Sequence, residues 1–178
     1  MVVLFNFLLI NQSNLDLPRA LPGFLPDWSE YKNSKYKIKV KYPKTWNYQL
    51  KDNPWGESFV IFIPLNHQQS GVKVAISVEP MPDLISLEEY TKIFKKRVLE
   101  HNEECKLIEQ KDSLLLHTNA YTVVYEFKYD NKRVKKMAIL ALRDKKAYIV
   151  YYEAKPYSFS KFEPVVKTLV NSLEIINH

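Results

Sequence analysis

The chain has 178 residues, a length that suits a single domain, and 46% of them are hydrophobic, enough for a buried core and too many for global disorder. Its three glycines, Gly23, Gly56 and Gly71, lie far apart, which excludes phosphate-binding loops of the P-loop and dinucleotide types. The net charge of +6 favours an acidic partner: a protein surface, nucleic acid or anionic lipid.

Residues 1–29 are predicted to be an apolar start followed by a proline-rich linker. Residues 2–10 are apolar, but they are about half as long as a membrane-spanning helix. No Lys or Arg precedes them and no small-residue cleavage site follows, so an export signal and a truncated or misassigned start both remain open. Pro18, Pro22 and Pro26 then favour an extended linker. We therefore place the folded domain at residues 30–178.

Three strands are predicted next, over residues 36–42, 57–64 and 71–80. In the first, apolar side chains alternate with lysines, which indicates a half-buried strand. Pro43 lacks the N–H that would continue the ladder, so this strand is expected to end there. Trp46 is then expected to fold back over the sheet and pack in the core.

An amphipathic helix is predicted over residues 87–101. Ser86 and Glu89 have the spacing of a capping box at its start. The residues of its inner face recur at helical spacing, and they are Leu87, Tyr90, Phe94, Val98 and His101. Residues 105–116 are less periodic, and they predict two short strands with a break near Asp112.

Residues 120–156 have the clearest strand pattern, and their short turns predict a three-stranded antiparallel meander. A second helix follows. Ser160 and Glu163 resemble a capping box at its start, but Pro164 would then lie beyond the first turn, so the start stays open. With strands outnumbering helices, this order favours an α+β fold, an antiparallel β-sheet sandwiched by helices.

The sequence contains no recognisable catalytic or metal-binding set, so we expect a protein that is not an enzyme. No pair of histidines has the spacing of metal ligands, and the metal ligands, if any, stay unassigned. Cys105 follows two glutamates, whose like charge is expected to raise the pKa of its thiol and make it unreactive. Cys105 is also the only cysteine, so no disulfide forms within the chain.

A dense basic cluster lies at the predicted hairpin near residue 130. Its members are Lys132, Arg133, Lys135 and Lys136. We interpret this cluster as a candidate binding surface for a protein partner with an acidic surface, and a merely solubilising turn is the alternative. Nucleic acid is not expected as a partner, because the tyrosines alternate into core positions instead of an exposed basic face.

Several segments, taken in order, resemble the PsbP family over about residues 31–176. They are IKVKYPKTW (38–46), FVIFIP (59–64), SLEEYTKIF (86–94), KAYIVYYEAKP (146–156) and VVKTLVNSLEI (165–175). The resemblance implies a PsbP-like α/β/α sandwich and a non-enzymatic protein bound to photosystem II subunits on the lumenal side of the thylakoid. It would support oxygen evolution or assembly, and calcium is implied as a cofactor by this resemblance alone.

The same resemblance implies a location in the thylakoid lumen or periplasm, peripheral to the membrane, and a cytoplasmic location is the alternative if the chain has no export signal. The related domain also occurs as the extracytoplasmic tail of cyanobacterial kinases and in bacterial lipoproteins. A sensor or protein-interaction domain outside photosynthesis is therefore the alternative function.

Overall fold

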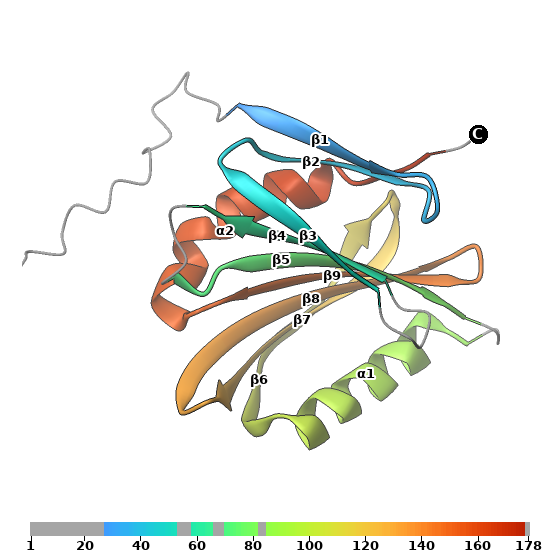
Figure 1. Ribbon diagram of the computed structural model, residues 1–178. Helices are drawn as coiled ribbons and strands as arrows, with labels where there is room; N and C mark the ends of the chain where they lie inside the picture. Colours follow the sequence, from blue (N-terminus) through green and yellow to red (C-terminus); the bar gives the residue numbers. More distant parts are fainter. Residues whose placement is uncertain (1–26, 53–57, 66–69, 82–84, 177–178) are drawn as a thin grey trace, which may run out of the picture.

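The computed structural model describes residues 27–52, 58–65, 70–81 and 85–176. Within these ranges the chain forms a seven-stranded sheet, a three-stranded sheet and two helices (Figure 1). The helices lie on opposite faces of the larger sheet, so the predicted α+β fold with an antiparallel sheet between helices is confirmed. The predicted apolar start and most of the linker lie outside the described residues.

The larger sheet is antiparallel throughout and has the strand order β3-β4-β5-β9-β8-β7-β6. In chain order its strands are β3 (Trp46–Asp52), β4 (Ser58–Pro64), β5 (Lys73–Pro80), β6 (Glu103–Leu115), β7 (Thr118–Tyr129), β8 (Lys132–Arg143) and β9 (Lys146–Ala154). The predicted meander is present as β7, β8 and β9. Its last strand pairs with β5, which joins the earlier and later halves of the domain.

The smaller sheet has the order β1-β2-β10, with β1 (Trp28–Asn33), β2 (Ile38–Pro43) and β10 (Glu174–Ile175). Its central strand β2 is the predicted strand with a lysine face, and it ends at Pro43 as expected. The hydroxyl of Ser172 accepts a hydrogen bond from the backbone N–H of Lys41 at 2.9 Å. This bond attaches the C-terminal end of the second helix to β2.

Helix α2 (Pro156–Asn171) covers one face of the larger sheet. Tyr152 is fully buried under it, and its hydroxyl donates a hydrogen bond to the carbonyl of Phe159 at 2.7 Å. Trp46 is only 5% exposed, and its ring centre lies 6.5 Å from that of Phe162. The predicted place of Trp46 in the core is therefore confirmed.

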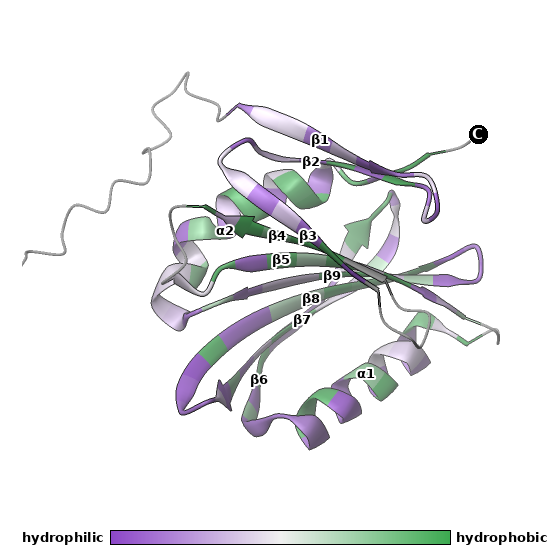
Figure 2. Ribbon diagram, in the orientation of Figure 1, coloured by the Kyte–Doolittle hydropathy of each residue, from purple (hydrophilic) through white to green (hydrophobic). Residues whose placement is uncertain are grey.

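Helix α1 (Leu87–His101) lies on the other face and has the bounds that the sequence predicts. The capping box between Ser86 and Glu89 is present. Hydrophobic and hydrophilic residues alternate along α1, as expected of an amphipathic helix (Figure 2). Its buried apolar residues are Tyr90, Phe94 and Val98, whereas His101, which the helical spacing also places on the inner face, is exposed.

The structure differs from the sequence-based prediction at five places. β1, β3 and β10 were not predicted; β1 is mostly polar and has only Tyr31 buried, so its pairing with β2 is not visible in its own pattern. Residues 103–115 form one strand instead of two, with two register shifts against β7 that disturb the alternation. Helix α2 begins at Pro156, before Ser160, because proline fits the first helical position.

Candidate functional site

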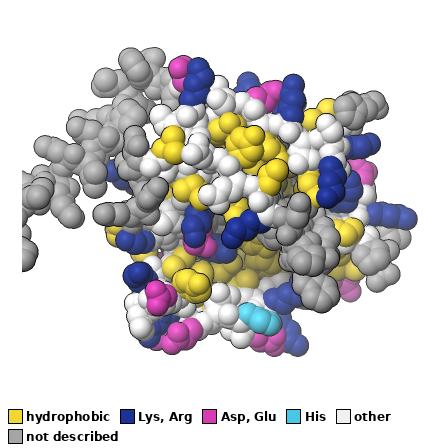
Figure 3. All heavy atoms as spheres, viewed as in Figure 1, with side chains coloured by type: hydrophobic (Ala, Val, Ile, Leu, Met, Phe, Trp, Pro, Cys, Tyr) yellow, Lys and Arg dark blue, Asp and Glu magenta, His cyan; other side chains and the backbone are white. Residues whose placement is uncertain are grey.

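Helix α1 covers only part of its face of the larger sheet. It packs mainly against β6, β7 and β8, while Ile61, Ala75 and Tyr151 on the neighbouring strands are only half-buried. A cavity of about 610 Å³ lies along this boundary between α1 and the sheet. Figure 3 shows hydrophobic side chains at the floor of this hollow and Lys and Arg side chains around it.

The floor of the cavity follows from the strand register. Ala75 on β5 lies between Ile61 on β4 and Tyr151 on β9, and the small alanine leaves room above the sheet between two larger neighbours. The ring of Phe94 on α1 lies 6.2 Å from that of Tyr151 and closes the floor on the helix side. The floor is therefore apolar and partly aromatic.

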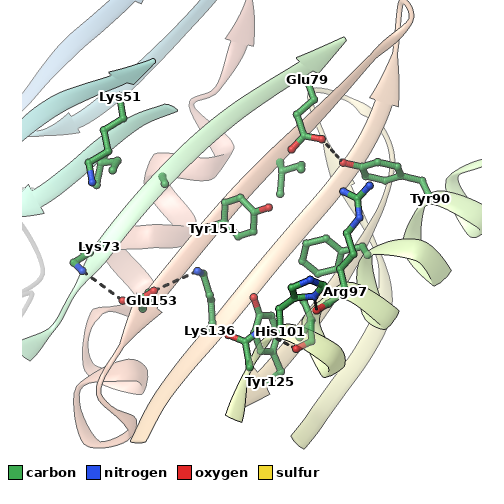
Figure 4. Close-up of a pocket in the computed structure, with 16 residues that line it drawn as sticks. Lys51, Lys73, Glu79, Tyr90, Arg97, His101, Tyr125, Lys136, Tyr151 and Glu153 are labelled. Atoms are coloured by element: carbon green, nitrogen blue, oxygen red, sulfur yellow. Dashed lines mark hydrogen bonds and ion pairs between the residues drawn. The ribbon is translucent and has the colours of Figure 1, made fainter. Parts of the chain in front are cut away.

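A cross-strand row of charges borders this floor. Glu153 on β9 lies between Lys73 on β5 and Lys136 on β8, with N···O distances of 3.6 and 3.3 Å (Figure 4). The Lys136 ammonium also lies 5.0 Å from the centre of the Tyr151 ring. One carboxylate thus serves two ammonium groups, which leaves a positive excess in this row.

Helix α1 contributes polar groups on the opposite side. The Tyr90 hydroxyl donates a hydrogen bond to Glu79 at 3.0 Å, and His101 Nδ1 lies 2.9 Å from the Arg97 carbonyl (Figure 4). Among the described residues, no ion pair joins Arg97 or Lys51 to a carboxylate. Both cations line the cavity, so they remain available to an anion.

The lining as a whole favours anions. Lys51, Lys73, Arg97 and Lys136 are opposed by two carboxylates, which leaves a net charge of +2 with neutral histidine. Burial raises the pKa of the Tyr125 phenol, so this group stays neutral and can donate a hydrogen bond. The described lining residues include no Ser, Thr or Cys nucleophile.

The predicted basic cluster does not form one surface. Because side chains alternate along β8, Lys132 and Lys136 point to the α1 face, whereas Arg133 and Lys135 point to the α2 face. Arg133 forms an ion pair with Glu104, and Lys135 lies 4.9 Å from the ring centre of Phe159. Of the four, only Lys136 lines the cavity. Their role in partner binding stays a prediction.

Most of the cavity's charged residues were missed by the sequence analysis. The alternation in residues 71–80 places Lys73 and Glu79 opposite the apolar face, but it does not reveal that β5 pairs with β9. Only this long-range pairing brings Glu153 beside Lys73. Arg97 belongs to a basic stretch of α1, and nothing in the sequence separates it from its solvated neighbours.

The histidines and Cys105, which the sequence analysis also considered, form no metal or catalytic site within the described ranges. No group of three or more His, Cys, Asp and Glu side chains there could hold a metal ion, so the expectation of calcium stays without assigned ligands. The pKa of the Cys105 thiol is raised, as predicted, but burial and not the neighbouring glutamates is the cause. No described helix is long and apolar enough to cross a bilayer.

Comparison with known proteins gives one family match. The family model described as PsbP matches residues 26–175, which is most of the chain. No curated protein is significantly similar to the chain in sequence.

Several solved structures share the fold. The solution structure of cyanobacterial PsbP from Synechocystis sp. PCC 6803 matches with a TM-score of 0.66 and 15% identity, covering 89% of this chain and 98% of that one. The Ran-binding protein Mog1p of Saccharomyces cerevisiae matches with a TM-score of 0.57 and 7% identity, covering 86% of this chain and 97% of that one. LpqN of Mycobacterium tuberculosis, which is involved in cell envelope biogenesis, matches with a TM-score of 0.57 and 7% identity, covering 85% of this chain and 91% of that one. At such identities the likeness concerns the fold alone.

Proposed function

Because this chain belongs to the PsbP family, we propose that it is a non-enzymatic binding protein that holds an anionic group of a protein partner in the cavity between α1 and the sheet. The observation that carries the proposal is the net positive lining of this cavity, in which Arg97 and Lys51 have no carboxylate partner among the described residues. Charge complementarity of this kind steers and selects protein partners.

The use of the fold in known proteins supports a protein partner. The yeast structure with the same fold is that of a Ran-binding protein, and a second one is a cyanobacterial PsbP. A scaffold that serves protein contacts in one distant relative is suited to them here. This support comes from the fold, so it does not identify the partner.

We propose photosystem II as the partner, with this protein peripheral to the membrane in the thylakoid lumen or periplasm and supporting oxygen evolution or assembly. Membership of the PsbP family supports this assignment. The protein is expected to co-purify with photosystem II from thylakoids, and a deletion strain is expected to evolve oxygen more slowly. Absence from washed thylakoids together with wild-type oxygen evolution in the deletion strain would contradict this partner.

The second candidate is an interaction domain outside photosynthesis. LpqN, which is involved in cell envelope biogenesis, and the Ran-binding protein Mog1p match the chain equally well. Both matches favour this candidate, because both proteins have roles other than photosynthesis. In that case a partner cross-linked in whole cells would come from another complex. Its binding would still depend on the cavity, because the proposed contact is the same.

A further inference from the structure

The apolar floor and the cations of the cavity lie side by side, and this combination restricts the anion. We propose that the cavity binds the C-terminal carboxylate of a protein chain whose last residue has an aromatic or large aliphatic side chain. This inference rests on the proposed function, since it names the group of the partner that the cavity holds. Capture of a C-terminal carboxylate is a known mode of peptide recognition, in which backbone N–H groups hold the carboxylate; in this cavity side-chain cations would do so.

The floor provides space for one such side chain. Ala75 lies between Ile61 and Tyr151, and all three are half-buried although they belong to central strands of the described sheet. Covering them would remove apolar surface from water, which is favourable. A volume of about 610 Å³ also lies in the range typical of specific ligand sites and exceeds what one carboxylate needs.

The cations lie where a carboxylate on the same residue would reach them. Lys136 stacks on the ring of Tyr151, so its ammonium lies directly beside the apolar floor. Arg97 lines the cavity from α1 on the opposite side, and its planar guanidinium can hold a carboxylate through two hydrogen bonds (Figure 4). A terminal residue carries its carboxylate and its side chain on one Cα, which matches cations next to an apolar floor.

The two carboxylates of the lining add selectivity. Glu79 and Glu153 would repel a run of acidic residues, whereas a single terminal charge still meets a net positive lining. The cavity is open toward solvent in Figure 3, so the rest of a long chain can leave without threading through the protein. Both features favour the end of a chain over an internal acidic segment.

The test uses fluorescently labelled short peptides with the full-length protein and measures fluorescence polarisation. A peptide that ends in Phe with a free carboxylate is compared with the same peptide amidated and with one that ends in Ala. We expect the amidated and the Ala-terminated peptides to bind at least about tenfold more weakly. Equal binding of the amidated peptide, or no binding of any peptide, would overturn the inference.

Variants locate the binding. Ala75→Leu, which fills the floor, and Arg97→Gln are expected to weaken binding of the Phe-terminated peptide at least about fivefold. Lys106→Gln, a residue that does not line the cavity, is expected to leave this affinity unchanged. Circular dichroism establishes that each variant is folded. Equal affinity of wild type and both cavity variants contradicts the proposed site. If N-acetyl-phenylalanine binds as tightly as the peptide, the cavity is a site for free small carboxylates and the inference is wrong.

The same variants separate this inference from the proposed function. If the Arg97→Gln variant no longer captures the partner from cells but no peptide binds the wild type, the proposed function stands. The inference that the cavity binds a C-terminal carboxylate is then wrong. If partner capture and peptide binding are both unaffected by the cavity variants, both proposals fail.

Discussion

The hydroxyl of Tyr90 on α1 donates a hydrogen bond to Glu79 on β5 at 3.0 Å, across one end of the cavity. Tyr90 is 7% exposed, and its ring also packs in the core under α1. This single side chain therefore joins the helix to a strand that α1 does not cover. The bond holds α1 to β5 at this end of the cavity.

We expect Tyr90→Phe to lower the free energy of unfolding by about 1 kcal/mol, because the ring keeps its packing while Glu79 loses a donor. Urea unfolding followed by circular dichroism measures this change. Tyr157→Phe is the matched control, since Tyr157 is 73% exposed. Equal stabilities of the two variants would mean that the bond to Glu79 contributes nothing.

The double charge reversal Lys51→Glu and Arg97→Glu is expected to weaken partner binding by more than about tenfold, most strongly at low salt. Both residues are exposed and line the cavity, so reversal should leave the fold intact. Lys106→Glu with Lys145→Glu changes the net charge equally away from the cavity. Equal weakening by the two pairs would show that only the overall charge matters.

Reversal of all four residues of the predicted basic cluster, Lys132, Arg133, Lys135 and Lys136, is expected to weaken partner binding in a salt-sensitive way. Since the four side chains divide between two faces of the sheet, the comparison with Lys136→Glu alone is informative. If the quadruple variant and Lys136→Glu lose the same binding affinity, the partner contact lies at the cavity. A larger loss for the quadruple variant assigns part of the contact to the hairpin, and unchanged binding at low salt contradicts a role of the cluster.

Replacing Trp46 by Ala should lower the free energy of unfolding by about 3–5 kcal/mol, because it leaves a cavity next to Phe162 in the core. Chemical unfolding followed by circular dichroism measures the loss without relying on tryptophan fluorescence. Trp28→Ala is the control, because Trp28 is only partly buried. A loss no larger than that of the control would show that Trp46 contributes little to the core.

The ion pair between Lys39 on β2 and Glu174 on β10 makes stability depend on pH. The hydrogen bond and charge of Lys39, 2.8 Å away, lower the pKa of Glu174 below its ordinary value. The stabilisation that Glu174 provides is therefore fully present above the ordinary pKa of a glutamate, and it is lost as the pH falls through the lowered pKa. In Glu174→Gln, the melting temperature should fall less on acidification below about pH 5 than in the wild type. Identical acid profiles would contradict a contribution of this pair.

The elements with a strong local pattern were predictable from the sequence. Helix α1 was predicted with its bounds because the capping box at Ser86 and the spacing of Tyr90, Phe94 and Val98 are encoded within the helix itself. The core position of Trp46 was predictable for a similar reason, since the proline before it ends the strand.

The cavity was not predictable, because it depends on long-range pairing. Lys73 and Glu153 are eighty positions apart in the chain, and only the register of β5 and β9 places them side by side. The basic cluster shows the reverse case. Its members are neighbours in the sequence, but they lie on two faces of the sheet because successive side chains of a strand point to opposite faces. Sequence proximity and spatial proximity disagree in both cases.

The smaller sheet joins the two ends of the described chain, since β2 pairs with β1 on one side and with β10 on the other. During synthesis, the β1–β2 hairpin emerges early but lacks its third strand until nearly all of the domain has been made. Pairing across such a sequence distance is slow compared with local pairing. The closure of this sheet is therefore a late step of folding, and any process that delays the last residues keeps the edge of β2 open for that time.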